Sequence, residues 1–252
     1  GLGDVYKRQV EALHYFMDNG GRFAVATGRA LPAFRMFADQ VPMNAPAVVC
    51  NGAALYDFQA EAYLDTLELP ESIRSQGQAV LDRFPSAAVE AYHLDNVIHA
   101  VRPNALTRQH QHVTHAGVEA VESLLEVPMP LVKVMFEDES QNLLPLWDHV
   151  RRQPWAADYE IFFSDKTLLE ITRKGASKGA MVARLAERLG ISREHIYCAG
   201  DENNDISMLT MAAQGFAPAN CVENVKNCGA TVVADCDHDT LAEIIAIMDK
   251  RY

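Results

Sequence analysis

The chain has 252 residues, 49% of them hydrophobic and 22% charged, which is typical of a globular protein with one large or two ordinary domains. Its net charge of −12 argues against non-specific nucleic-acid binding, because an acidic surface repels phosphate backbones. The sequence has no apolar run of about 20 residues and no signal-peptide pattern, so we expect a cytoplasmic protein without a membrane partner. Cys50 and Cys198 lie in apolar runs, and buried free thiols fit that compartment. We expect it to be a monomer or a homodimer.

The first nine residues, GLGDVYKRQ, carry no apolar period and resemble a peptide translated from sequencing-adapter DNA. We expect residues 1–9 to be foreign and the chain proper to run from about Val10. A harmless polar N-terminal tail is the alternative interpretation.

From Val10 the pattern alternates between helical and strand spacing, as in a strand–helix–strand unit of a parallel sheet. The first predicted elements are a helix that ends at Gly20-Gly21, a strand at 22–27, a helix at 31–41 and a strand at 45–50.

The middle of the chain has a different pattern, in which paired strands and helices indicate an α+β layer with an antiparallel sheet. Its predicted helices are 70–84, 104–125 and 140–152, and its predicted strands are 87–93, 96–102, 131–137 and 159–163. After residue 168 the alternation returns, with helices at 177–189, 204–213, 222–227 and 239–249 and strands at 195–200, 214–217 and 230–234. We therefore predict an α/β fold: a Rossmann-like parallel-sheet core of residues 1–69 and 168–252, with an inserted α+β domain at 70–167.

Four polar segments follow predicted strands or open predicted helices, where open parallel sheets bind their ligands. They are Thr27-Gly28-Arg29, Asn51-Gly52, Ser177-Lys178 and Asp201-Glu202-Asn203-Asn204-Asp205. The first can hold a phosphate oxygen, although a Thr N-cap and a surface Arg explain it equally well. A tight turn explains the second fully.

The acidic segment from Asp201 to Asp205 and the nearby Lys178 carry the stronger signals. Crowded carboxylates repel, and a divalent cation such as Mg²⁺ offsets that repulsion. Helix capping by Asn203 or Asn204 is the alternative, but it explains one or two of the five residues. Lys178 follows a good N-cap, Ser177, so its ammonium opposes the helix dipole unless it faces an anion. A solvated surface Lys is the alternative.

Three histidines within six residues, His110, His112 and His115, invite a metal-site interpretation. No Cys or acidic pair lies nearby in the sequence to complete such a site. A solvated helix face is therefore the favoured interpretation.

The segments FAVATGR, VVCNGA, LEITRKGASKG and AGDENNDISML resemble, in sequence and order, motifs of the haloacid dehalogenase (HAD) superfamily, specifically its Cof-type phosphatases. The resemblance runs from about Val10 to the C-terminus and implies a HAD core with an inserted α+β cap. It also implies Mg²⁺-dependent hydrolysis of small phosphorylated metabolites, such as sugar phosphates, through an aspartyl-phosphate.

The resemblance also implies roles for individual residues. Thr27 and Lys178 would be catalytic groups that hold the transferring phosphoryl group, and Asp201 and Asp205 would serve the metal. The full phosphate- and substrate-binding set is Thr27, Gly28, Arg29, Asn51, Lys178 and Asn204. Substrate contacts from the cap are expected around residues 92–96.

One departure from the family pattern is severe. The nucleophile and general acid of this family lie in a DxDGT segment on the first core strand, and Asp4 has no second Asp at that spacing. We therefore expect a truncated reading frame that lacks its nucleophile and its first strand, unstable and inactive as written, whose intact parent is a phosphatase. The alternative is a non-catalytic protein that binds a phosphorylated ligand. A phosphomutase or a narrower sugar-phosphate phosphatase is a further possibility.

Overall fold

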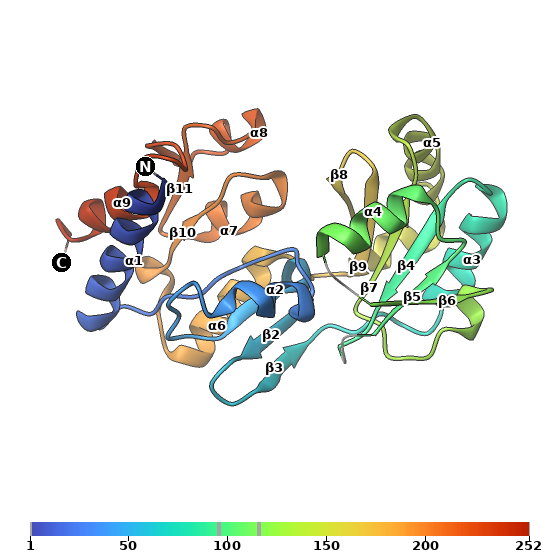
Figure 1. Ribbon diagram of the computed structural model, residues 1–252, viewed down its shortest axis with the longest axis horizontal. Helices are drawn as coiled ribbons and strands as arrows, with labels where there is room; N and C mark the ends of the chain where they lie inside the picture. Colours follow the sequence, from blue (N-terminus) through green and yellow to red (C-terminus); the bar gives the residue numbers. More distant parts are fainter. Residues whose placement is uncertain (1, 95–96, 115–116, 252) are drawn as a thin grey trace.

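The computed structural model describes residues 2–94, 97–114 and 117–251, which form two lobes joined by two chain crossings (Figure 1). One lobe holds two three-stranded sheets, and the other holds a six-stranded sheet. The mixture of parallel strands and helices confirms the predicted α/β class.

The first lobe contains both ends of the chain (Figure 1). Its first sheet, β1–β2–β3, is antiparallel, and its second sheet, β10–β11–β12, is parallel. Its elements are α1 (Leu2–Asp18), α2 (Leu31–Ala38), β1 (Ala47–Val49), β2 (Ala54–Asp57), β3 (Ala62–Thr66), α6 (Lys178–Leu189), β10 (Tyr197–Ala199), α7 (Ile206–Met211), β11 (Gln214–Pro218), α8 (Glu223–Lys226), β12 (Thr231–Val233) and α9 (Thr240–Met248).

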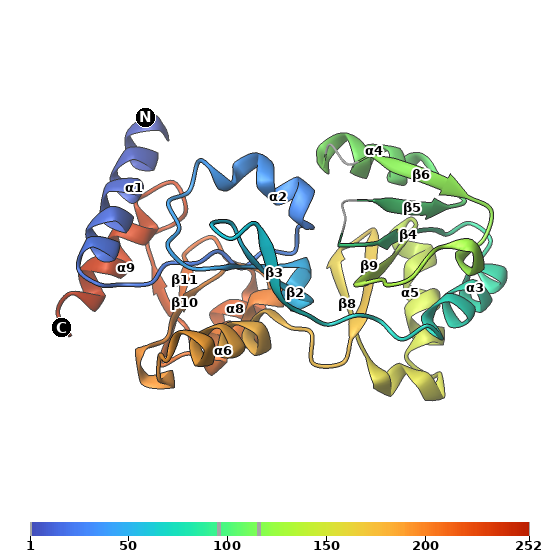
Figure 2. The same cartoon turned by 90° about the horizontal axis from the view of Figure 1, so that it is seen from below.

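The second lobe is built on a sheet with strand order β6–β5–β4–β7–β9–β8. Helices α3 and α5 pack on one face through an apolar cluster, and α4 lies on the opposite face (Figure 2). The elements are α3 (Ile73–Arg83), β4 (Ala88–Tyr92), β5 (Ile98–Val101), α4 (Ala105–Thr114), β6 (Val118–Val121), β7 (Lys133–Glu137), α5 (Ser140–Val150), β8 (Tyr159–Asp165) and β9 (Leu168–Arg173).

The end of the predicted helix 104–125 is wrong. Helix α4 stops at Thr114, and residues 118–121 form β6, which pairs in parallel with β5. A four-residue edge strand carries little periodicity of its own, so pairing with β5 decides its conformation.

Strand β9 lies in the six-stranded sheet, where it pairs with β7 and β8. The chain returns to the first lobe after β9. The boundaries 1–69, 70–167 and 168–252 remain a prediction, and β9 packs with the sheet of the inserted segment.

The predicted strand at 22–27 forms one isolated parallel bridge, between Ala26 and Val48. Val48 N–H donates to Val25 O and Thr27 N–H donates to Val48 O, both at 2.9 Å, so this segment is bonded toward β1. The strand β10 ends its own sheet. Within the described part of the chain, the two three-stranded sheets are therefore not joined through hydrogen-bonded strands.

An apolar cavity of about 330 Å³ separates segment 22–26 from β10. Its lining includes Phe16 of α1, Val25, Cys198 of β10 and Ile244 of α9. Unpaired strand edges beside an apolar space are unusual, because buried backbone N–H and C=O groups are nearly always paired.

Residues 2–9 continue helix α1, and Arg8 pairs with Asp239 at 2.8 Å. Whether residues 1–9 are foreign stays a prediction. All five cysteines are free, and Cys50 and Cys198 are buried, as predicted. Across the described ranges, none of the helices is both long and apolar enough to cross a membrane.

Candidate functional site

The acidic segment after β10 folds around Asp205. This carboxylate is buried, with 3% of the residue exposed, and its Oδ1 accepts from Lys178 Nζ at 2.6 Å. Its Oδ2 accepts from the backbone N–H groups of Asp201 at 2.9 Å and Glu202 at 3.0 Å. Asp205 therefore fixes both the ammonium of Lys178 and the backbone that carries Asp201.

Capping does occur in this segment, but Asn203 and Asn204, the predicted caps, do not provide it. Glu202 and Asp205 form a reciprocal capping box around the 3₁₀ turn Asn203–Asp205, so the caps are acids rather than asparagines. The side chain of Asn204 instead points across to another segment, and Asp201 is exposed at the end of β10.

Lys178 opens helix α6, as predicted, with the Ser177 hydroxyl accepting from Ala180 N–H at 3.1 Å. The residue is buried, with 7% exposed, so the solvated-surface alternative is wrong. The next residue, Gly179, packs directly on helix α7: a Cβ there would lie 2.2 Å from Ser207 O. That close approach holds the first turn of α6 against the acidic segment.

The loop after segment 22–26 is tied to the loop after β1. Thr27 Oγ1 accepts from Arg29 N–H at 3.1 Å, and Thr27 O accepts from Asn51 N–H at 3.0 Å. Gly28 faces Asn51, since an added Cβ would lie 2.9 Å from its Oδ1. Arg29 is exposed and its guanidinium lies 5.2 Å from the centre of the Phe37 ring.

Asn51 connects the two lobes through its side chain. Its Oδ1 accepts from Asn204 Nδ2, and its Nδ2 donates to Glu170 Oε2 of β9, both at 2.9 Å. The backbone is strained here, because Cys50, Asn51 and Gly52 all have positive φ, at 51°, 55° and 95°. Such strain persists where the surrounding structure over-determines it, often at functional sites. A tight turn therefore does not fully explain this segment.

The structure brings most of the predicted residues together. Lys178 contacts Asp205, Asn204 contacts Asn51, and the loop of Thr27 and Gly28 lies against Asn51. Arg29 follows Gly28 and is exposed. Residues 95 and 96 of the predicted cap contacts, and His115, lie outside the described residues.

The sequence interpretation missed a chain of buried polar side chains in the second lobe. Glu170 Oε1 lies 3.5 Å from Lys133 Nζ, and that ammonium lies 4.1 Å from the centre of the Tyr92 ring. Tyr92 donates its hydroxyl to Glu90 Oε2 at 2.5 Å. Lys133 and Glu170 are charged residues within apolar strands, and this pattern could have indicated the buried polar chain.

The donor set at the carboxyl end of β10 fits a hard divalent cation. Asp201 presents an exposed carboxylate there, whereas both Asp205 oxygens already accept hydrogen bonds. Mg²⁺ commonly takes one or two carboxylates and leaves its remaining positions to water and phosphate. Asp201 is therefore the better ligand, and Asp205 positions Asp201 and Lys178.

Comparisons with known proteins identify the family. The profile of a family described as haloacid dehalogenase-like hydrolase matches residues 3–245. Pyridoxal phosphate phosphatase YbhA of Escherichia coli is 27% identical over 94% of this chain and 89% of its own length. The Bacillus subtilis protein YitU, a 5-amino-6-(5-phospho-D-ribitylamino)uracil phosphatase, is 24% identical over 96% of this chain and 90% of its own length.

The fold also matches a solved structure. A haloacid dehalogenase-like hydrolase from Bacteroides thetaiotaomicron superposes with a TM-score of 0.82 at 21% identity, covering 96% of this chain and 92% of that one.

Proposed function

Because the chain belongs to the family of haloacid dehalogenase-like hydrolases, we propose that its site serves the Mg²⁺-dependent hydrolysis of small phosphomonoesters through an aspartyl-phosphate. The observation that carries the proposal is the buried Lys178–Asp205 pair beside the exposed Asp201. Two relatives act on phosphorylated small molecules by name. Sugar phosphates and similar metabolites are the substrate class that we propose.

In this proposal each residue has a distinct task. The Lys178 ammonium and the N–H groups after Thr27 hold the phosphoryl oxygens, where a fixed positive charge stabilises the developing negative charge. Asp205 orients the Lys178 ammonium through their 2.6 Å contact. Asp201 holds Mg²⁺, which when bound offsets the charge of the phosphoryl group. Asn204 and Asn51 form the wall that faces the second lobe.

We propose that the nucleophilic aspartate belongs on a strand that fills the apolar cavity between segment 22–26 and β10. Such a strand would pair with both edges and would end beside Lys178, because carboxyl ends of parallel strands share one edge of a sheet. An apolar segment ending in Asp-x-Asp-Gly fits the lining. The chain as written is then expected to bind phosphate without turning substrate over.

Calorimetric titration with inorganic phosphate in the presence of Mg²⁺ tests the binding half of the proposal. We expect binding by the chain as written and at least a tenfold loss in Lys178→Met. Arg184→Met is the matched control, because Arg184 lies on the same helix and pairs with Asp65 at 3.0 Å. Equal affinity in the two variants would remove Lys178 from the site.

A phosphatase assay tests the catalytic half. Pyridoxal phosphate and sugar phosphates should be hydrolysed when an apolar strand ending in Asp-x-Asp-Gly is fused ahead of Val10, and not by the chain as written. Phosphate binding without turnover in both forms would favour the non-catalytic binding protein. Turnover by the chain as written, lost in Lys178→Met, would contradict the missing nucleophile.

A further inference from the structure

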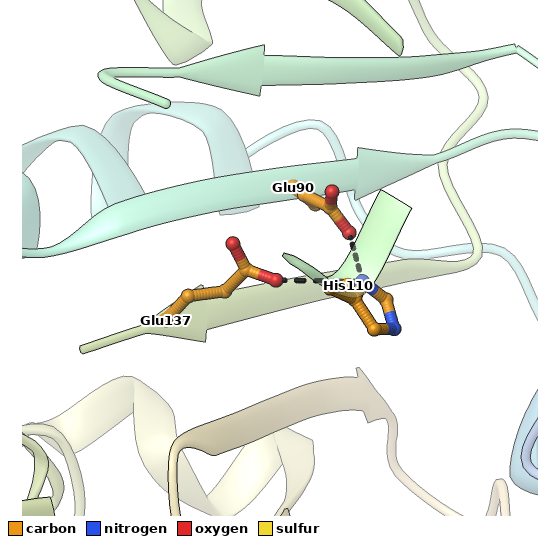
Figure 3. A group of neighbouring side chains, drawn as sticks. All are labelled: Glu90, His110 and Glu137. Atoms are coloured by element: carbon orange, nitrogen blue, oxygen red, sulfur yellow. Dashed lines mark hydrogen bonds and ion pairs between the residues drawn. The ribbon is translucent and has the colours of Figure 1, made fainter. Parts of the chain in front are cut away.

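A second cluster of metal-ligating side chains lies in the six-stranded sheet, apart from the acidic segment after β10. Glu90 on β4 and Glu137 on β7 project from the same face, and His110 on α4 reaches down between them (Figure 3). His110 Nδ1 lies 2.9 Å from Glu90 Oε2 and 3.4 Å from Glu137 Oε1. Three separate elements thus deliver one imidazole and two carboxylates to one point.

The two carboxylates are buried beyond what their neighbours can offset. Both residues are 0% exposed, and three of their four oxygens, Glu137 Oε1, Glu137 Oε2 and Glu90 Oε1, have no hydrogen-bond partner. The ammonium of Lys133, on the same strand as Glu137, pairs with Glu170. Buried carboxylates of this kind are normally hydrogen-bonded, protonated or bound to a metal.

The spacing of the three side chains suits a single ion. One ligand atom from each of Glu90, His110 and Glu137 lies within 4.8 Å of the others. Neighbouring ligands around a tetrahedral ion with bonds of about 2.1 Å are separated by about 3.4 Å, so small rotamer changes close the site. One nitrogen and two oxygen donors favour Zn²⁺ or Mn²⁺ over the all-oxygen ions Mg²⁺ and Ca²⁺.

We propose that Glu90, His110 and Glu137 bind one divalent transition-metal ion of the Zn²⁺ or Mn²⁺ class. The His110 side chain is 21% exposed, which gives the ion a path from solvent. Tyr92 holds Glu90 through its hydroxyl, the kind of outer contact that orients a metal ligand. The bound ion fixes helix α4 to the sheet and neutralises the two buried charges.

The proposal is independent of the function proposed above, because its residues lie on a different sheet from Asp201. A competing account is that Glu137 carries a proton, since burial and the charge of Glu90 raise the pKa of Glu137 to about 7. The two accounts differ in whether an ion binds at neutral pH.

The test is calorimetric titration of the full chain with ZnCl₂ or MnCl₂ at pH 7.5 after dialysis against EDTA. All proteins in this test, including the reference called the background chain, carry Asp201→Asn, so that the acidic segment after β10 does not bind a second ion. We expect one ion per chain and a loss of affinity of at least tenfold in His110→Ala and in Glu137→Gln. The controls His112→Ala and Glu126→Gln, both at exposed positions of the same lobe, should bind as the background does.

A spectroscopic readout guards against misfolded variants. Co²⁺ bound to an imidazole and carboxylates gives visible absorption, which should be present in the background chain and absent in His110→Ala with unchanged circular dichroism. Affinities within threefold of the background in both cluster variants would overturn the proposal. The proposal would also be overturned if neither Zn²⁺ nor Mn²⁺ bound at one ion per chain up to a concentration on the order of 1 mM, which matches the affinity of the weakest biological sites.

Discussion

Two buried carboxylate groups in this molecule meet opposite environments. Asp205 accepts three hydrogen bonds, one from Lys178 and two from backbone N–H groups. Glu137 is equally buried, yet both of its oxygens lack a hydrogen-bond partner. The first carboxylate is complete within the protein, and the second one requires a proton or a cation from outside.

The difference shows that burial alone does not identify a binding group. Asp205 is buried and accepts hydrogen bonds on both oxygens, whereas Asp201 is exposed. Glu137 is buried beside Glu90 and His110, and the lack of a hydrogen-bond partner for its oxygens indicates a binding group. Variants that remove either carboxylate should therefore change stability in opposite directions.

Asp205→Ala should have the largest effect. It leaves the Lys178 ammonium, whose side chain is 8% exposed, buried without its partner, and breaking a buried pair in this way costs about 3–5 kcal/mol. Urea unfolding of the variant measures the loss. The control Asp201→Ala changes an exposed carboxylate and should stay within about 0.5 kcal/mol of the parent. A loss below about 1 kcal/mol for Asp205→Ala would show that the pair is not a stability element.

Glu137→Gln should stabilise the metal-free protein at alkaline pH. Burial and the charge of Glu90 raise the pKa of Glu137 from 4.5 to about 7, so the folded state binds the proton more tightly than the unfolded state. The associated stability is present below about pH 4.5 and is lost as the pH rises to about 7, an effect of about 3 kcal/mol at most.

Urea unfolding in EDTA between pH 4.5 and 8 measures this dependence. The titratable side chains of His110, Lys133, Tyr92 and Glu90 face the same space, so the variant is compared with the parent at each pH. Glu137→Gln should flatten the profile, and Glu126→Gln should leave it unchanged. A parent profile that does not fall over this range would contradict the raised pKa.

Gly52→Ala, in the loop after β1, should lower the free energy of unfolding by about 2 kcal/mol more than Gly175→Ala does. Both glycines have positive φ, at 95° and 84°, so both substitutions carry the strain of that conformation. Only Gly52 lies against backbone: an added Cβ would be 2.1 Å from Ser177 O, whereas nothing lies within 4 Å at Gly175. Thermal unfolding of the two variants separates steric contact from backbone strain, and equal losses would contradict the close approach.

The smallest expected effect concerns the link between the lobes. Asn204→Ala and Glu170→Ala each remove one partner of Asn51, and a double-mutant cycle should give a coupling energy of about 0.5–1 kcal/mol. Urea unfolding of the parent, both single variants and the double variant provides the cycle. Strict additivity would mean that the Asn51 side chain does not transmit a change from one lobe to the other.

Much of the acidic site could be predicted because its groups are close in sequence or follow strands directly. Asp201 to Asp205 are consecutive, and Ser177 marks the start of the helix that carries Lys178. Capping rules and the common edge of parallel strands then bring these segments together. The role of Asp205 as the partner of Lys178 was not predicted, because the choice between ligand and partner depends on distances of a few tenths of an ångström.

Residue spacing along the chain was enough to predict the alternation of helices and strands, the interrupted α/β organisation and the polar segments at the strand ends. Three features depended on long-range contacts instead: residues 118–121 form a strand, β9 joins the six-stranded sheet, and His110 meets two glutamates. These three cases have one cause. Short strands and buried polar contacts gain their stability from partners far away in the chain, and local periodicity carries no information about those partners.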